Sequence, residues 1–207
     1  MPIRATGALV AALLGTVSVL AACGGDSEPE PAPAAPAPTP TAQPAATTTT
    51  PPPAPPGVVV DCSTESWADF TGAFFDPANL VVGPLVLVGA AMKTSAGVVE
   101  SVGGNKFPLL VKDGHTVTVR VPKEARAHAS LGYGPLPQGE VFVRDGHDTV
   151  TFLACDDSDP SRSTGDVAVT FWSGFLLANE PVCLPLDIWA DGASRPRRVE
   201  VALGNDC

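Results

Sequence analysis

Apolar residues recur at every second position through most of the chain after Val58, and this period constrains the fold more than any other feature of the sequence. The clearest run is His115–Val121, in which three valines alternate with polar residues. The same pattern recurs in four further segments: Thr149–Ala154, Asp166–Trp172, Val182–Ile188 and Val199–Leu203. Strict alternation is typical of an antiparallel sheet with one buried face.

Turn signals separate these segments and favour an all-β domain. Asp-Gly pairs stand at 113–114, 145–146 and 191–192. The pair at 113–114 predicts a hairpin, because type I′ turns need positive φ. We expect an antiparallel β-sandwich, Ig-like or similar, of about seven to ten strands. A closed barrel is the alternative.

Shorter segments complete the expected sheet. Candidate strands are Leu85–Ala91, Phe107–Lys112 and Glu140–Arg144. The Ala-rich stretch Glu124–Leu131 fits either a helical turn or a strand with Ala127, Ala129 and Leu131 facing inward.

Proline dominates the chain before residue 58. Of 23 prolines, 12 fall between Pro29 and Pro56, a stretch with almost no large apolar side chains. Such a stretch cannot form a core, so we expect residues 23–57 to be a disordered, polyproline-like linker. At about 3.1 Å per residue it would reach on the order of 100 Å when extended. It is either a spacer through a cell-wall layer or an unspecialised linker. The remaining residues, 58–207, have the size of one domain.

The first residues have the pattern of an export signal. Met1–Arg4 carries one positive charge, and Ala5–Ala22 is apolar or small throughout. From the residues alone, 1–22 is a cleaved signal peptide or an uncleaved helix near the lower length limit for a bilayer span.

The end of this run, Leu20-Ala21-Ala22-Cys23, resembles the lipobox of bacterial lipoproteins. The resemblance implies cleavage before Cys23 and a diacylglycerol on its thiol. It therefore implies a partner, the lipid bilayer, and a place on the extracytoplasmic side of the cell membrane. Two acyl chains hold a protein stably where one chain holds it marginally.

Four cysteines follow Cys23, and an even number in an exported domain predicts two disulfides. A chain reversal near Ala193–Ser194 would bring Cys183 close to Cys207, which leaves Cys62 to pair with Cys155. The other two pairings stay open. A zinc site is the alternative, but no Cys-x₂-Cys spacing occurs.

Four motifs of the domain resemble uncharacterised exported proteins of actinobacterial type, over most of residues 58–207. They are Gly83-Pro84-Leu85, Phe152–Cys155, Phe171–Phe175 and Pro181–Leu186. Such families have no assigned chemistry, so the resemblance implies no activity.

Net charge limits the partners. From residue 58 onward, 19 Asp and Glu stand against 11 Lys and Arg, a formal charge of −8. An acidic domain repels phosphate backbones, which argues against nucleic acid. It also repels anionic headgroups, so contact with a membrane would need another cause.

Side chains that carry chemistry are few. His115 and His147 each follow an Asp-Gly pair or lie beside it, and His128 lies in the Ala-rich stretch. No Gly-x-Ser-x-Gly motif occurs that would support a Ser–His–Asp arrangement. We expect these histidines on exposed loops and assign no catalytic residue and no cofactor.

The densest acidic cluster is Asp156-Asp157-Ser158-Asp159, which with Asp166 offers oxygen ligands suited to Ca²⁺. It lacks the spacing, the central Gly and the terminal Glu of an EF-hand loop. We interpret it as a solvated loop and predict no metal.

Three tryptophans, Trp67, Trp172 and Trp189, suggest an aromatic platform for sugar rings. Trp172 and Trp189 lie opposite the main apolar series of their strands. In sandwiches, however, tryptophan usually packs in the core, often against a disulfide.

These observations favour a non-enzymatic binding module at the cell envelope. Its partner would be a cell-wall polymer, another envelope protein or a small ligand. A structural envelope protein without a ligand, or a secreted hydrolase, are the alternatives.

Overall fold

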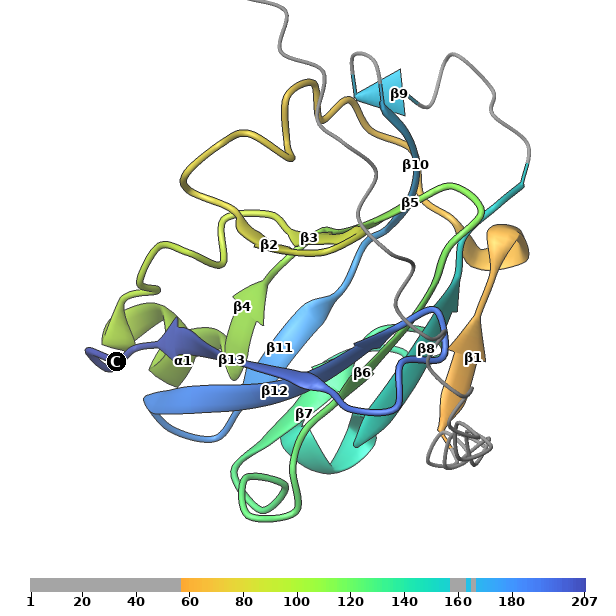
Figure 1. Cartoon of the computed structure of the whole chain (residues 1–207). Helices are drawn as coiled ribbons and strands as arrows, with labels where there is room; N and C mark the ends of the chain where they lie inside the picture. Colours follow the sequence, from red (N-terminus) through yellow and green to blue (C-terminus); the bar gives the residue numbers. More distant parts are fainter. Residues whose placement is uncertain (1–56, 157–162, 165–166) are drawn as a thin grey trace, which may run out of the picture. The chain divides into compact units, whose positions relative to one another are not determined.

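The computed structural model describes residues 57–156, 163–164 and 167–207 of the chain (Figure 1). These residues form 13 strands in three sheets, which confirms the all-β, sandwich-like fold expected from the sequence. The expected signal peptide, Cys23 and the proline-rich linker lie outside the described residues. Strands outnumber the seven to ten expected because several have only two or three residues, too few for a period to be recognised.

Sheet A has five strands and carries four of the five alternating segments; the fifth, Asp166–Trp172, contributes a strand to sheet B. In spatial order they are β1 (Val58–Val60), β8 (Thr149–Leu153), β6 (Thr116–Arg120), β12 (Val182–Ala190) and β13 (Arg197–Leu203). Its inner face is fully apolar: Val117, Val119, Val150, Phe152, Leu184, Leu186, Ile188 and Val201 are all buried. The alternation predicted for these strands is therefore confirmed. One pair, β1 with β8, is parallel rather than antiparallel.

Sheet B also has five strands, and it is buried on both faces. They are β2 (Leu80–Val82), β3 (Leu85–Leu87), β5 (Leu109–Lys112), β10 (Val167–Trp172) and β9 (Ser163–Thr164). One face contributes Leu85, Leu109 and Val111 to the core shared with sheet A. The other face packs Val86, Leu110, Val169 and Phe171 against Phe70, Ala73 and Phe74. A sheet covered on both faces explains the unbroken apolar runs in β3 and β5.

Sheet C is joined to sheet B by strands that bend from one sheet into the other. It comprises β4 (Gly104–Lys106), β11 (Phe175–Ala178) and β7 (Ala129–Gly132). Strand β4 continues into β5, and β10 continues into β11 (Figure 1). Because β4 pairs with β11 and β5 pairs with β10, both paired segments pass from sheet C into sheet B together. At the bend, a side chain on Gly174 would collide with the ring of Tyr133. Bends of this kind close a sandwich at its corner.

Three aromatic side chains meet in the shared core. Phe152 lies between Tyr133 and Trp172, with both ring centroids 5.3 Å away. The buried hydroxyl of Tyr133 donates a hydrogen bond of 2.6 Å to the carbonyl of Phe107, and burial raises the pKa of Tyr133 far above its usual value. The hydroxyl therefore stays protonated and its hydrogen bond satisfied.

Several local predictions were wrong. Asp113-Gly114 forms a turn with Gly114 at φ 76°, but it connects β5 of sheet B to β6 of sheet A and closes no hairpin. Glu140–Arg144 is not a strand; a 3₁₀ turn, η2, spans Val143–Asp145. Strand β3 stops at Leu87, well short of Ala91.

In the Ala-rich stretch, the strand alternative holds only from Ala129, because Ala127 is exposed in the turns before it. A short helix, α1 (Ala96–Val102), was not predicted from the sequence. Its ends are fixed by local signals: the Ser95 side chain accepts from the amide of Val98, and Gly103 adopts φ 70° after the last turn.

Candidate binding site

The segment between β1 and Trp67 is fastened to sheet B at several points. A short 3₁₀ turn, η1 (Cys62–Thr64), begins at Asp61, whose carboxylate accepts hydrogen bonds from the Ser63 amide and hydroxyl. These bonds lower the pKa of Asp61. The carbonyl of Asp61 accepts a 3.2 Å hydrogen bond from the indole of Trp172. The chain therefore leaves β1 along a fixed path.

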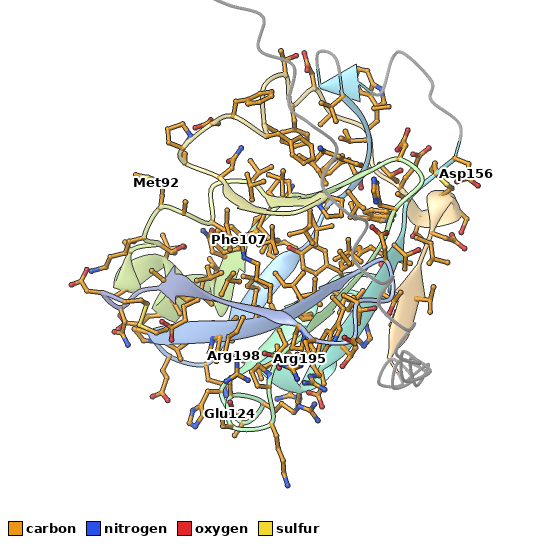
Figure 2. All side chains as sticks on the ribbon, in the orientation of Figure 1. Met92, Phe107, Glu124, Asp156, Arg195 and Arg198 are labelled. Atoms are coloured by element: carbon orange, nitrogen blue, oxygen red, sulfur yellow. A yellow bond between two sulfur atoms is a disulfide. The ribbon has the colours of Figure 1, made fainter. Side chains whose placement is uncertain are left out.

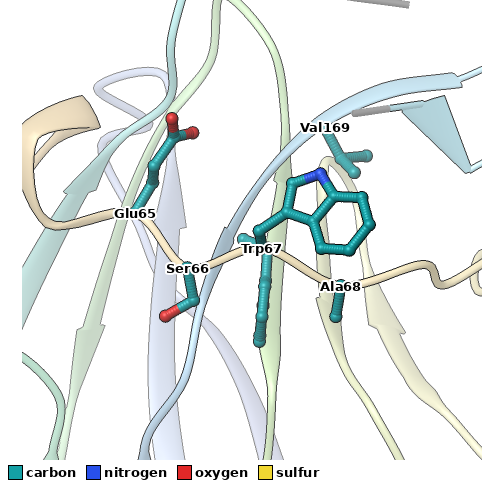
Figure 3. Close-up of a pocket in the computed structure, with 6 residues that line it drawn as sticks. Glu65, Ser66, Trp67, Ala68 and Val169 are labelled. Carbon is teal, nitrogen blue, oxygen red and sulfur yellow. The ribbon is translucent and has the colours of Figure 1, made fainter. Parts of the chain in front are cut away.

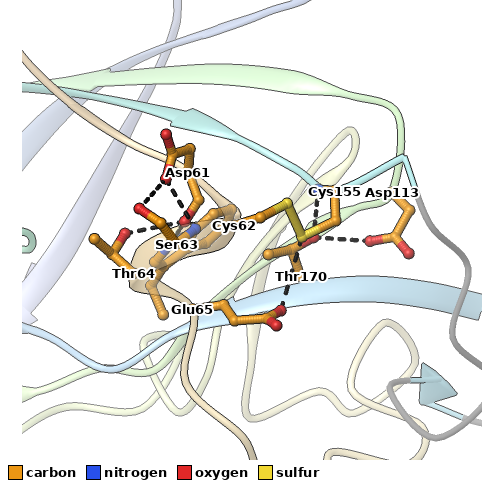
Figure 4. The surroundings of a disulfide bond; sticks show 9 residues. Asp61, Cys62, Ser63, Thr64, Glu65, Asp113, Cys155 and Thr170 are labelled. Carbon is orange, nitrogen blue, oxygen red and sulfur yellow. Dashed lines mark hydrogen bonds between the residues drawn. A yellow bond between two sulfur atoms is a disulfide. The ribbon is translucent and has the colours of Figure 1, made fainter.

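A disulfide between Cys62 and Cys155 ties this turn to the end of β8, with 5.5 Å between the Cα atoms (Figure 4). The amide of Cys155 donates to the hydroxyl of Thr170 on β10 at 2.7 Å. That hydroxyl donates in turn to Asp113 at 2.8 Å. The predicted pairing of Cys62 with Cys155 is confirmed, and the bridge links the segments that follow β1 and β8, two neighbouring strands of sheet A.

The second disulfide joins Cys183 of β12 to Cys207, with 5.6 Å between the Cα atoms. It closes the hairpin of β12 and β13, which turns at Asp191-Gly192, where both residues have positive φ as a type I′ turn requires. The predicted pairing is confirmed, since chain reversal alone brings these cysteines together.

Trp67 follows directly on the fastened segment and stands out into solvent. The amide of Ser66 donates to the carbonyl of Phe171 at 2.7 Å, and the hydroxyl of Ser66 accepts from the amide of Ser173 at 3.2 Å. The backbone under Trp67 is thus held against β10. Its side chain is nonetheless 78% exposed.

The indole forms one wall of a shallow pocket of about 190 Å³, which we call the Trp67 depression (Figure 3). Its lining is Glu65, Ser66, Trp67, Ala68, Val169 and Phe171. Ligand pockets for whole small molecules measure roughly 300–1,000 Å³. The depression is therefore large enough for one ring or one side chain of a longer partner.

The three tryptophans do not form a common platform. Trp172 is buried in the core beside the segment that carries the first disulfide, as tryptophan in a sandwich often is. Trp189 is half-buried on the outer face of sheet A, with the guanidinium of Arg120 4.5 Å above its ring. Of the three, only Trp67 offers its ring to a partner.

The histidines lie in separate surroundings. The Nδ1 of His115 lies 2.8 Å from Asp191, and the Nδ1 of His128 lies 2.8 Å from Glu180. His147 lies 3.2 Å from the carbonyl of Pro135. The hydrogen bond from His115 lowers the pKa of Asp191. In the described part of the chain, none of these rings is hydrogen-bonded to a serine, threonine or cysteine side chain.

The acidic cluster lies mostly outside the described residues, which include Asp156 but not Asp157, Asp159 or Asp166. Elsewhere in the described ranges, no group of three or more His, Cys, Asp and Glu side chains is placed to hold a metal ion. Within the same ranges, no helix is long and apolar enough to cross a membrane.

Sequence reasoning missed a charged cluster on the outer face of sheet A. The buried carboxylate of Asp187 accepts hydrogen bonds from Arg198 at 2.8 Å and from Arg120 at 3.0 Å. The hydrogen bond from Arg198, together with Arg120, lowers the pKa of Asp187. The signal was present in the outward positions of β6, β12 and β13, but it becomes visible only when cross-strand partners are known.

No family model, no curated protein and no solved structure matches this chain.

Proposed function

We propose that this protein is a lipid-anchored component of the bacterial cell envelope whose sandwich binds a glycan at the Trp67 depression without catalysing a reaction. The Cys23 lipobox motif supports the anchor, and two disulfides within one small domain are typical of an oxidising, exported setting.

One observation carries the binding role: an indole that is 78% exposed stands on a backbone fastened to β10. Exposed large aromatic side chains on rigid supports are typical of recognition sites, because little side-chain entropy is lost on binding. The CH groups of a sugar ring pack well on such a face. The small size of the depression favours a polymer that places one ring there.

The separate environments of His115, His128 and His147 argue against a hydrolase. General acid–base catalysis needs a base within hydrogen-bond reach of the group it activates. Two of these histidines are instead paired with exposed carboxylates, and the third lies against a backbone carbonyl.

Replacing Cys23 with alanine should abolish acylation, because the thiol is the only group that the expected lipid attachment uses. Metabolic labelling with a fatty-acid analogue, followed by membrane fractionation, measures this. The wild type should appear labelled in the membrane fraction and the variant unlabelled. A variant that remains labelled would refute the anchor.

Replacing Trp67 with alanine should weaken binding to purified peptidoglycan or to its soluble oligosaccharides by about 30-fold, since a central tryptophan typically contributes about 2 kcal/mol. Sedimentation with insoluble polymer and calorimetry with soluble fragments measure this. Trp67→Phe should keep part of the affinity because a ring remains. Phe75→Ala is the matched control, because Phe75 is 84% exposed but does not line the depression. Equal affinities for wild type and Trp67→Ala would refute the glycan site.

A further inference from the structure

We infer that the free edge of β13 pairs with the same edge of a second copy of this chain, so that sheet A continues across a two-fold axis. Strand β13 is the last strand of sheet A, and β12 is the only strand it pairs with in the described part of the chain. An edge strand presents backbone groups that can bond another strand. This pairing is independent of the proposed lipid anchor and glycan site.

The backbone of β13 shows which of its groups point out of the sheet. The carbonyl of Ala202 accepts a 2.9 Å hydrogen bond from the amide of Thr94, on the side away from β12. Backbone groups of successive residues point to opposite sides of a strand, so those of Arg198 and Glu200 point the same way as those of Ala202. Pro185 agrees with this assignment, because it lies opposite Glu200, where the β12–β13 ladder needs no N–H from it.

The free stretch of this edge is short and bounded at both ends. Among the described residues, the outward amide and carbonyl groups of Arg198 and Glu200 have no backbone partner. Thr94 occupies the edge beyond them, from Ala202 onward. Pro196, which has no N–H, precedes the strand at its other end. A partner must therefore bond the backbone of Arg198 and Glu200 alone.

Only one symmetric antiparallel register uses all of these groups. With Val199 on the two-fold axis, Arg198 of each copy lies opposite Glu200 of the other, and each such pair exchanges two backbone hydrogen bonds. A shift that sets Arg198 against Arg198 would place Glu200 against Pro196, which has no N–H to give. A shift in the other direction would place Arg198 against Ala202, whose carbonyl already bonds Thr94.

The same register ends where the edge is blocked. Pro196 of the second copy lies opposite Ala202, and the chain before it comes from β12, on the side away from the axis. A longer strand of another protein would instead run into Thr94. A hollow of about 490 Å³ beside Glu200 and Ala202 leaves room for side chains of the second copy. A second β13 therefore fits this edge better than a foreign strand.

Charge selects the same register as the backbone does. Arg198 faces the outer side of sheet A, where it bonds Asp187, and Figure 2 shows it on the side of the sheet opposite Phe107 of the core. Glu200 faces the same way, is exposed, and forms no ion pair with another described residue. With Val199 on the axis, Arg198 of one copy meets Glu200 of the other, whereas either shifted register sets like charges opposite one another.

Arg198 has donors left for this contact. Three of its N–H groups bond acidic side chains: two bond Asp187, and one bonds Glu124 at 3.3 Å. A guanidinium carries five N–H groups, so two remain for Glu200 of the second copy. The ion pair across the axis therefore adds to the existing cluster and does not disrupt it.

On the inner side of the sheet, the pairing covers apolar surface. Val199 is partly buried against the core, and on the axis it meets Val199 of the second copy. Arg197 lies opposite Val201 of the second copy, so the two Arg197 residues are four positions apart, about 13 Å, and are largely screened from each other. Lys93 and Asp206, which lie beyond the paired stretch, neutralise each other at 2.7 Å.

The dimer fixes how the two domains face. An axis perpendicular to sheet A leaves the outer faces of both copies on one side and sheet B of both copies on the other. The Trp67 depressions are lined by Val169 and Phe171 of sheet B, so they point in the same direction. One polymer can then contact both depressions.

Cysteine cross-linking tests the position of the axis. The protein is the chain from residue 23 with Cys23→Ser, so that no acyl group and no other free thiol contributes. The Cα atoms of a non-hydrogen-bonded pair lie about 4.5 Å apart, a distance that a disulfide bridges. Val199→Cys should therefore form intermolecular disulfides at least about tenfold faster than Val59→Cys, which reacts only by random collision. Val59 is the matched control because it is 58% exposed on the opposite edge strand of sheet A.

Sedimentation velocity tests the charge pairing without a cysteine. The paired stretch is short, so we expect a weak dimer that forms between about 10 μM and 1 mM protein. Glu200→Lys should raise the dissociation constant at least about tenfold, because both attractive cross-strand pairs become repulsive. Glu100→Lys is the matched control, since it makes the same charge change at an exposed residue of α1 and should dimerise like wild type. Near-ultraviolet circular dichroism confirms that both variants are folded.

Equal cross-linking rates for Val199→Cys and Val59→Cys would overturn the inference, as would a wild type that stays monomeric at the highest concentration. A dimer that Glu200→Lys and Glu100→Lys affect equally would also overturn it, because the contact would then lie elsewhere. Each of these outcomes leaves acylation of Cys23 and glycan binding at Trp67 standing.

Discussion

Replacing both Cys62 and Cys155 with serine should lower the free energy of unfolding by about 4.6 kcal/mol, because the bridge closes a loop of 93 residues. A cross-link restricts the unfolded chain more strongly as the loop grows. Replacing Cys183 and Cys207 instead should cost about 3.4 kcal/mol, since that loop spans only 24 residues. Urea-induced unfolding of the two double variants measures both values.

The order of these two losses is the decisive result. The first bridge also holds Cys155 where its amide bonds Thr170, so its loss weakens the junction between the sheets as well. The second bridge fastens the end of a hairpin that already has seven paired positions. A larger loss for the Cys183/Cys207 variant would contradict the account of the first bridge as the main cross-link of the domain.

Replacing Asp187 with asparagine should lower the free energy of unfolding by about 2–3 kcal/mol near neutral pH. The carboxylate is only 4% exposed and serves two guanidinium groups, so its loss leaves both without their shared partner. Glu124→Gln is the matched control. Glu124 meets the same Arg198 but is 63% exposed, and such surface pairs contribute about 0–1 kcal/mol.

The effect of Asp187 should depend on pH in a defined direction. Its arginine partners lower the pKa of the carboxyl group in the folded protein. The stabilisation is therefore complete above the unfolded pKa of about 3.9, and it disappears as the pH falls through the lower folded value. Urea unfolding of wild type and Asp187→Asn at neutral pH and below about pH 3 should give curves that converge in acid. A difference that is constant across this range would show that the charge of Asp187 is not responsible.

The sequence predicted the long strands of sheet A and, in sheet B, strands β3, β5 and β10, but it did not show that sheet B is buried on both faces. Alternation is clearest where one face is buried and the other meets water, as in Thr116–Arg120 of β6. Leu109–Lys112 of β5 has core on both sides, so its period vanishes. The Asp113-Gly114 pair predicted the turn correctly, but it did not show that the two flanking strands belong to different sheets. Turn geometry is local, whereas the sheet that a strand joins depends on distant strands.

The candidate sites were likewise predictable only in part. Cysteine pairing was predictable because Cys183 and Cys207 flank a single chain reversal. The exposure of Trp67 was not, since an isolated tryptophan in an irregular segment has no periodic neighbours to place it.

The placement of Cys62 directly after β1 determines how the domain carries mechanical load. Tension applied through the N-terminal part of the chain enters at Gly57 and passes first into β1, a strand of three residues at the edge of sheet A. Once this strand has peeled away, the covalent link from Cys62 to Cys155 carries the load past the chain between the two cysteines. The domain can thus yield by one short strand under stretching, while strands β2 to β8 inside the closed loop are shielded from tension.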